Sequence, residues 1–176
     1  MTNEFSRVER LDTIGDEERR VVVTAEADER RALARRFRLV AIDSLEAEFA
    51  IRREAAGIAA RGRVRAAVVQ ACAVTGEPLR TRVDESVDLR FVESAGSDDE
   101  VELAEDTLDT IEIEGGGIDL GEAAAETMVL ALDPFPRSRN AATALKDAGV
   151  SSEEESGPFG ALAALKARLG GSGATD

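Results

Sequence analysis

The sequence contains no histidine, tryptophan or tyrosine, one cysteine and six phenylalanines. Without histidine, the chain lacks the side chain that most often acts as a general base near pH 7, the usual nucleophile–histidine pairs and most zinc ligand sets. One cysteine cannot form a disulfide within the chain. Few aromatic rings argue against a surface that holds single-stranded nucleic acid by base stacking. These absences favour a binding protein over an enzyme.

Long apolar runs are also missing. The N-terminal residues lack the apolar stretch of a signal peptide, and no later stretch has the roughly 18 apolar residues that a membrane span requires. We therefore expect a cytoplasmic protein that does not contact a membrane.

Negative charge is abundant but uneven. The net charge is −14; residues 91–136 hold 14 carboxylates and no Lys or Arg, whereas residues 1–90 hold 17 acidic and 17 basic residues and residues 137–176 hold five of each. A local negative field attracts basic partners over about a Debye length, roughly 8 Å at physiological salt. The alternative is a solvated acidic loop that only aids solubility. The candidate partner-binding carboxylates are Asp98, Asp99, Glu100, Glu102, Glu105 and Asp106.

Alternating apolar and polar residues predict strands in the first half of the chain. The pattern favours an α+β fold, with a curved, mostly antiparallel sheet or a partly closed β-barrel, two packed helices and a short C-terminal helix. The expected domain is residues 1–136, including an acidic loop at 93–117, followed by a linker at 137–158 and an amphipathic helix at 159–170. The predicted strands are 45–52, 63–74 and 82–91 in antiparallel series, with shorter candidates at 5–11, 20–25 and 110–114.

Two longer helices are predicted. The first runs from an N-cap at Asp28 to about residue 39, with one apolar face and an arginine stripe opposite it. The second begins after an N-cap at Asp119 and ends before Pro134, because the residue before a proline is pushed out of the helical region.

Cys72 stands three residues before Thr75, where a second cysteine would complete a C-x-x-C pair. One thiolate without histidine cannot complete a tetrahedral zinc site, so we expect no metal and no cofactor. Cys72 is instead expected to be a small buried hydrophobe on a strand, because no neighbour marks it as a nucleophile of low pKa with a paired base.

Three blocks of sequence resemble the YceD family, which is associated with accumulation of large-subunit ribosomal RNA. They are VQACAVTGEPL at 69–79, IDLGE through ALDPFP at 118–136, and PFGALAALK at 158–166; the last is similar to the ending of an alphaproteobacterial branch. The resemblance implies a structural role for the motif residues Cys72, Thr75, Gly76, Glu77 and Pro78. It also implies a ribosome-biogenesis factor for 23S ribosomal RNA, with ribosomal protein L32 as a candidate partner and no established catalytic activity.

Two binding mechanisms remain open, and a third class of function is kept beside them. The acidic segment is expected to hold a basic ribosomal protein; alternatively, an arginine surface contacts RNA directly. The remote third possibility is an acid–base enzyme that uses paired carboxylates, although we expect no small-molecule substrate. The arginines of the RNA alternative are Arg31, Arg35, Arg38, Arg61, Arg63 and Arg65.

Overall fold

The computed structural model describes residues 3–93, 109–113 and 115–150. The candidate carboxylates at 98–106 and the predicted C-terminal helix at 159–170 lie outside the described residues. The chain forms two compact units: the first comprises Met1–Ala71 and Pro78–Pro134, and the second comprises Cys72–Glu77 and Phe135–Asp176.

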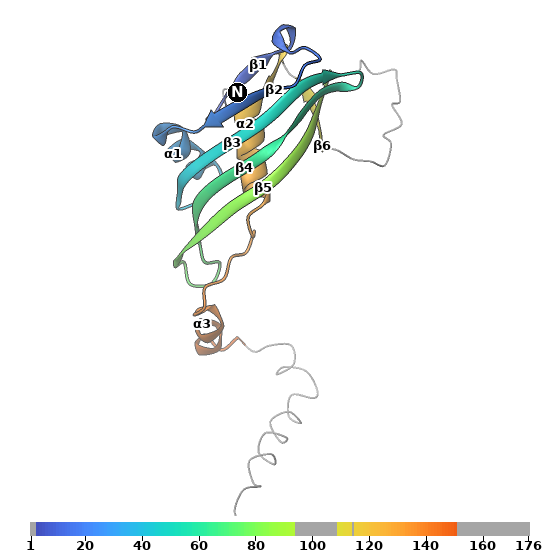
Figure 1. The fold of residues 1–176 in the computed structure, drawn as a ribbon. Coiled ribbons are helices and arrows are strands. Elements are labelled where there is room, and N and C mark those ends of the chain that lie inside the picture. Colours follow the sequence, from blue (N-terminus) through green and yellow to red (C-terminus); the bar gives the residue numbers. More distant parts are fainter. Residues whose placement is uncertain (1–2, 94–108, 114, 151–176) are drawn as a thin grey trace, which may run out of the picture. The chain divides into compact units, whose positions relative to one another are not determined.

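The first unit is built on a five-stranded sheet in the order β2-β3-β4-β5-β6 (Figure 1). Neighbouring strands are antiparallel except β5 and β6, which are parallel. The prediction of an α+β fold with a curved sheet is confirmed. The sheet does not close on itself, so it is not a barrel. Its strands are β2 (Arg19–Thr24), β3 (Ala41–Glu54), β4 (Gly57–Ala71), β5 (Pro78–Glu93) and β6 (Asp109–Ile113).

A short antiparallel pair completes the unit. Strand β1 (Val8–Arg10) pairs with β7 (Gly117–Asp119), and a single 3₁₀ turn, η1 (Leu11–Thr13), follows β1. Helix α2 (Leu120–Leu130) begins directly after β7 and lies across the concave side of the large sheet (Figure 1).

The core forms between α2 and one face of the sheet. Alternate residues of β3, such as Leu45, Phe49 and Ile51, are buried, and they pack with Leu120 and Met128 of α2. The residues between them on each strand point to the opposite face. Every second residue of a strand and one face of α2 are apolar, and these side chains pack against each other in one layer.

Gly62 allows β3 and β4 to approach each other closely. A Cβ at this position would lie 1.9 Å from the backbone oxygen of Glu48, so no side chain fits without moving a strand. Glycines of this kind mark points where another backbone passes close by.

Helix α1 (Ala27–Arg36) begins earlier than the predicted N-cap at Asp28. Its N-cap is Glu26, whose backbone N–H donates to Glu29 Oε2 at 2.7 Å. The helix also ends before residue 39: Arg38 has a φ of 56°, so it belongs to the turn that follows the helix. The stripe predicted from helical spacing therefore includes one residue that is not helical.

The start of α2 agrees with the sequence. The Asp119 carboxylate accepts hydrogen bonds from the backbone N–H groups of Gly121 at 3.1 Å and Glu122 at 3.2 Å. Helix α2 ends at Leu130, ahead of the two prolines, as expected.

The second unit joins the Cys72–Glu77 turn to the chain from Phe135 onward. It contains helix α3 (Ala141–Asp147), which lies within the residues 137–158 that the sequence marked as a linker. The described part of that segment is thus partly helical.

Candidate functional site

The solvent-facing side of the large sheet carries a row of arginines on its central strand. Arg61, Arg63 and Arg65 alternate along β4 and are all exposed. Each faces a carboxylate on β5: Arg61 Nε lies 3.1 Å from Asp88 Oδ1, Arg63 pairs with Asp84, and Arg65 Nε lies 3.6 Å from the same Asp84 carboxylate. The row is therefore neutralised within the sheet.

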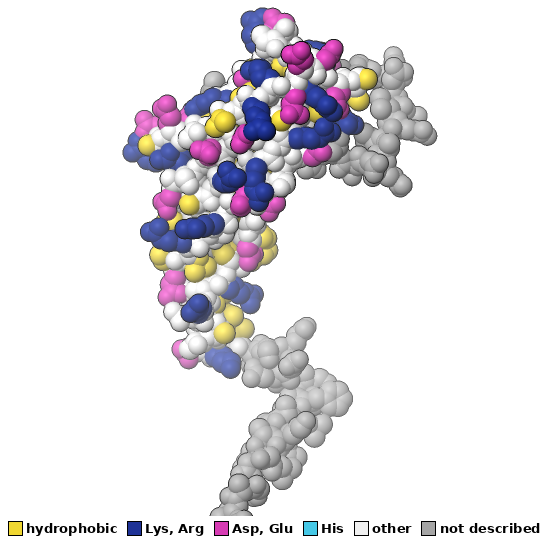
Figure 2. Space-filling model, in the orientation of Figure 1, with side chains coloured by type: hydrophobic (Ala, Val, Ile, Leu, Met, Phe, Trp, Pro, Cys, Tyr) yellow, Lys and Arg dark blue, Asp and Glu magenta, His cyan; other side chains and the backbone are white. Residues whose placement is uncertain are grey.

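The neighbouring strand β3 adds a second line of carboxylates. Glu46 lies opposite Arg65 and Glu48 lies opposite Arg63 in the strand register. Glu48 also pairs with Arg20 of the edge strand β2, at 3.1 Å. Figure 2 shows the resulting pattern, with Lys and Arg side chains interleaved with Asp and Glu over this face.

The six arginines of the RNA alternative consequently divide into two groups. Arg31 pairs with Asp28 within α1, and the three β4 arginines pair across the sheet, so four of them are held by carboxylates. Arg35 and Arg38 are exposed and form no ion pair with a described residue.

The second unit is centred on Cys72, which is buried. Its backbone N–H donates to the Glu77 carbonyl at 2.8 Å, and its carbonyl accepts from Gly76 N–H at 2.9 Å, so residues 72–77 form a closed turn. Gly76 has a φ of 73°, a conformation that glycine adopts at little cost. Cys72 thus follows Ala71, the last residue of β4. It lies in a turn and not, as the sequence pattern had predicted, on a strand.

The Cys72 sulfur accepts two backbone hydrogen bonds. Thr75 N–H donates to Sγ at 3.4 Å, and Ser138 N–H donates at 3.2 Å. A further hydrogen bond links this turn to the segment around residue 138: Ala73 N–H donates to the Pro136 carbonyl at 2.8 Å. These bonds join residues 72–75 to residues 136–138.

This environment changes the acidity of the thiol. Hydrogen bonding from the Thr75 side chain, followed by the backbone N–H groups of Ser138, Thr75 and Val74, lowers the pKa of Cys72 from 9.0 to about 6, although burial opposes the shift. The sequence pattern showed no neighbour that would mark Cys72 as a nucleophile of low pKa with a paired base, and the groups that lower its pKa are hydrogen-bond donors and not a base. Thr75 and Val74 lie beside Cys72 in the sequence, but the Ser138 N–H comes from a segment 66 residues away, which no spacing within the motif reveals.

Glu77 forms the polar rim of the turn. Its carboxylate accepts from Thr75 Oγ1 at 3.0 Å and from Asn140 Nδ2 at 3.2 Å. Hydrogen bonds from Ser138, Asn140 and Thr75 lower the pKa of Glu77. Four motif residues therefore build the turn, and Pro78 starts β5 immediately after it.

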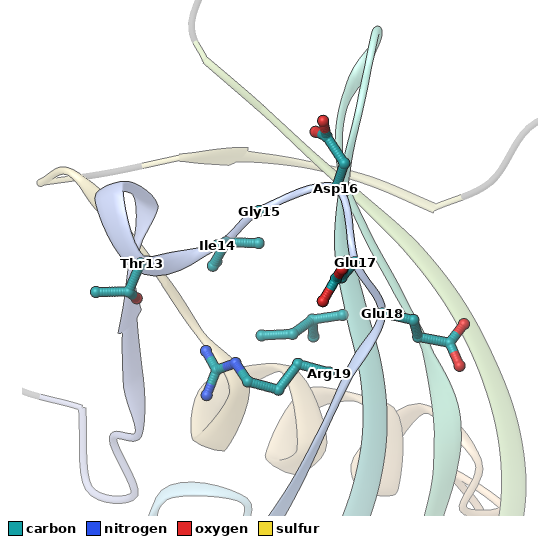
Figure 3. Close-up of a pocket in the computed structure, with 8 residues that line it drawn as sticks. Thr13, Ile14, Gly15, Asp16, Glu17, Glu18 and Arg19 are labelled. Atoms are coloured by element: carbon teal, nitrogen blue, oxygen red, sulfur yellow. The ribbon is translucent and has the colours of Figure 1, made fainter.

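A separate hollow lies between the end of β1 and the start of β2 (Figure 3). It has a volume of about 600 Å³ and is lined by Thr13, Ile14, Gly15, Asp16, Glu17, Glu18, Arg19 and Ile51. Asp16 and Glu18 point away from its centre, whereas the Arg19 side chain extends beneath Ile14. Arg19 already pairs with Glu9 at 2.6 Å, whereas the Glu17 carboxylate points into the hollow (Figure 3).

The described residues offer little for metal or acid–base chemistry. Within them no three Cys, Asp or Glu side chains gather as a metal-binding group. Among the same residues Glu126 is the one carboxyl group whose pKa is raised; partial burial and the nearby Glu122 charge raise it, yet it sits exposed on α2. Nor does any helix there have the length and apolar character needed to cross a membrane.

Taken together, these features define an α+β protein with a charge-paired sheet face and a cysteine-centred turn that holds the chain after α2. The family comparison agrees with the sequence motifs: the model of the large ribosomal RNA subunit accumulation protein YceD matches residues 60–166, and the chain belongs to that family. Neither curated proteins nor solved structures match the chain. The family assigns a role in accumulation of large-subunit ribosomal RNA.

Proposed function

We propose that this chain is a non-enzymatic ribosome-assembly factor of the cytoplasm, which supports 23S ribosomal RNA accumulation by holding a basic ribosomal protein. Ribosomal protein L32 is the natural candidate. The proposal rests on one contrast: the sheet arginines are largely neutralised by neighbouring carboxylates, whereas residues 91–136 hold 14 carboxylates and no cation.

The described ends of that segment support this assignment. Glu93 closes β5 and Glu112 lies on the edge strand β6, and both are exposed. The six candidate carboxylates lie between these two residues in the sequence, outside the described residues. A basic partner docked at this edge of the sheet would meet the carboxylates of Glu93 and Glu112.

Complementary charge across such an interface accelerates encounter and weakens as salt increases. Ribosomal RNA, as a stronger polyanion, would then compete for the basic protein. The factor would keep that protein soluble until RNA takes it over.

Binding of purified L32 to the full chain, measured by calorimetry at increasing salt, tests the proposal. The test variant replaces Asp98, Asp99, Glu100, Glu102, Glu105 and Asp106 with Asn or Gln. The control makes the same change at Asp16, Glu17, Glu18, Glu153, Glu154 and Glu155, so both variants lose six negative charges. We expect the first to lose binding and the second to keep it; equal loss in both would show that only net charge matters and would refute the proposal.

A further inference from the structure

One arginine of α1, one in the turn after α1 and one on β5 are exposed and form no ion pair with a described residue. They are Arg35, Arg38 and Arg82, and of these Arg35 interacts with the charge of Glu4 at longer range. The other arginines of the first unit pair with carboxylates or, like Arg30 and Arg53, donate to backbone carbonyls. Charge that the fold leaves uncompensated is charge that remains available for a partner.

The topology brings these arginines to the same end of the sheet. Val40, two residues after Arg38, donates its backbone N–H to the Val69 carbonyl at 2.9 Å. Val69 lies opposite Arg80 in the register of β4 and β5, and Arg82 follows on the same side of β5. The chain leaving α1 therefore enters the sheet as β3 at the end where Arg80 and Arg82 lie, with β4 between β3 and the strand that carries them.

Carboxylates become sparse at this end. Arg82 lies opposite Ala67, which lies opposite Ser44, so the row that holds Arg82 contains no acidic residue on β3 or β4. Arg80 is 85% exposed and has a loose contact of 3.4 Å to Asp43. By contrast, the rows that hold Arg61, Arg63 and Arg65 include a carboxylate on one or both neighbouring strands.

The backbone at Arg38 gives an independent reason to assign this arginine a role beyond the fold. Arg38 N–H donates to Arg35 O at 3.3 Å and Leu39 N–H donates to Ala34 O at 2.9 Å, the pattern that closes a helix with a left-handed residue. Glycine is the favoured residue there, because a side chain at positive φ is strained. In the described part of the chain, Arg38 is the one non-glycine residue with positive φ. Strain of this kind is often retained where a side chain has a function.

We propose that Arg35, Arg38, Arg80 and Arg82 form a phosphate-binding patch that contacts the backbone of RNA. Guanidinium groups match phosphate oxygens in a forked geometry and stay charged at all relevant pH values. The patch offers no exposed aromatic side chain, so it recognises the sugar–phosphate backbone and not base identity. The proposal goes beyond the holding of a basic protein and does not depend on it, because the two surfaces share no residue.

The test is binding of fluorescein-labelled single-stranded RNA to the full chain, followed by fluorescence anisotropy over a range of salt. The patch variant combines Arg35→Gln, Arg38→Gly and Arg82→Gln. The control combines Arg20→Gln, Arg61→Gln and Arg63→Gln, which removes three ion-paired positive charges from the same unit. Both variants shift the net charge by the same amount, so any difference between them reports local contact.

We expect the patch variant to weaken RNA binding about tenfold at low salt and to reduce the slope of log affinity against log salt by about 2. The control should change affinity by less than about threefold, with the slope unchanged. Arg38→Gly alone should raise the melting temperature while it weakens RNA binding, which separates a binding role from a structural one. Equal weakening in both triple variants, no RNA binding by the wild-type chain, or loss of a protein partner with RNA binding intact would overturn the proposal.

Discussion

The backbone N–H of Ser138 donates a hydrogen bond to Sγ of Cys72 at 3.2 Å, although the two residues are separated by 66 positions in the sequence. A sulfur that accepts such bonds is stabilised as the thiolate, because the negative form gains more from a donor than the neutral form does. The hydrogen bonds at the centre of the second unit therefore favour the thiolate form of Cys72 and lower its pKa to about 6.

We predict that the Cys72 thiol titrates with a midpoint near 6 in the native protein, well below the ordinary value of 9.0. The ultraviolet absorbance of the thiolate measures this directly, since Cys72 is the only cysteine of the chain. Replacing Thr75 with alanine should raise the midpoint because it removes the side chain with the largest effect, whereas Thr75→Ser should preserve it. A native midpoint at the ordinary thiol value would contradict the hydrogen-bonding geometry.

The lowered pKa also predicts how stability changes with pH. A group whose pKa is lower in the folded state stabilises the protein fully above its unfolded pKa, and this contribution disappears as pH falls through the folded pKa. For Cys72 the contribution should decline between pH 9 and pH 6 and vanish below it. The stability difference between wild type and Cys72→Ala, measured by urea unfolding, should therefore be larger at pH 9 than at pH 6. A pH-independent difference would mean that the thiol packs as a neutral group.

Patterns local in the sequence predicted most of the fold. Alternation located β3 and β5 because one face of each strand is buried, and the Asp119 cap located α2 because the capping residue precedes the helix directly. The start of α1 was misplaced because Glu26 satisfies the first helical N–H groups in place of Asp28, and both are acidic residues two positions apart. Sequence rules therefore indicate that a helix begins near these residues, but they do not show which of two nearby acidic residues is the N-cap.

The candidate sites were harder to predict because they depend on residues distant in sequence. The ion pairs of Arg61 and Arg63 depend on the register of β4 against β5, which alternation alone does not fix. Ser138 and Asn140, which complete the Cys72 turn, lie in residues that looked like a polar linker. Only a signal linking the turn to residues 136–140 could have found them.

Replacing Asp119 with alanine should destabilise the first unit by about 2 kcal/mol, at the upper end for loss of a helix cap. The carboxylate serves the start of α2 and also accepts Arg7 N–H at 2.8 Å, so its removal leaves donors from two segments unsatisfied. Burial tends to raise the pKa of Asp119, but these hydrogen bonds outweigh it and the pKa is lowered. Thermal unfolding of Asp119→Ala beside Asp119→Asn measures the effect. The asparagine variant, which retains one acceptor, should lose less; an equal loss would show that charge and not capping matters.

Gly62→Ala should destabilise the protein by about 1–3 kcal/mol, because the added methyl group meets the Glu48 backbone oxygen and strands β3 and β4 must separate. The matched control is Gly15→Ala, where an added Cβ has no atom within 4 Å. Chemical unfolding should distinguish the two substitutions clearly. If Gly62→Ala behaves like the control, β3 and β4 do not approach as closely as the structure shows.

Arg36 joins the two helices of the first unit, and its coupling to Glu122 can be measured. Its guanidinium lies 2.5 Å and 2.9 Å from the two carboxylate oxygens of Glu122, and Glu4 lies 3.0 Å away. The hydrogen bonds to Glu122, and after them those to Glu4, raise the pKa of Arg36, so its guanidinium stays charged. The Glu122 side chain is only 16% exposed, and the contact is bidentate, so we expect a coupling energy of about 1–2 kcal/mol, above the usual value for surface pairs.

A double-mutant cycle of Arg36→Gln and Glu122→Gln gives this value. The same cycle for Arg10 and Asp12, whose side chains are 74% and 62% exposed, should give a clearly smaller coupling energy, because solvent screens this pair. Similar coupling in the two cycles would mean that solvent screens the helix–helix pair as strongly as a surface pair.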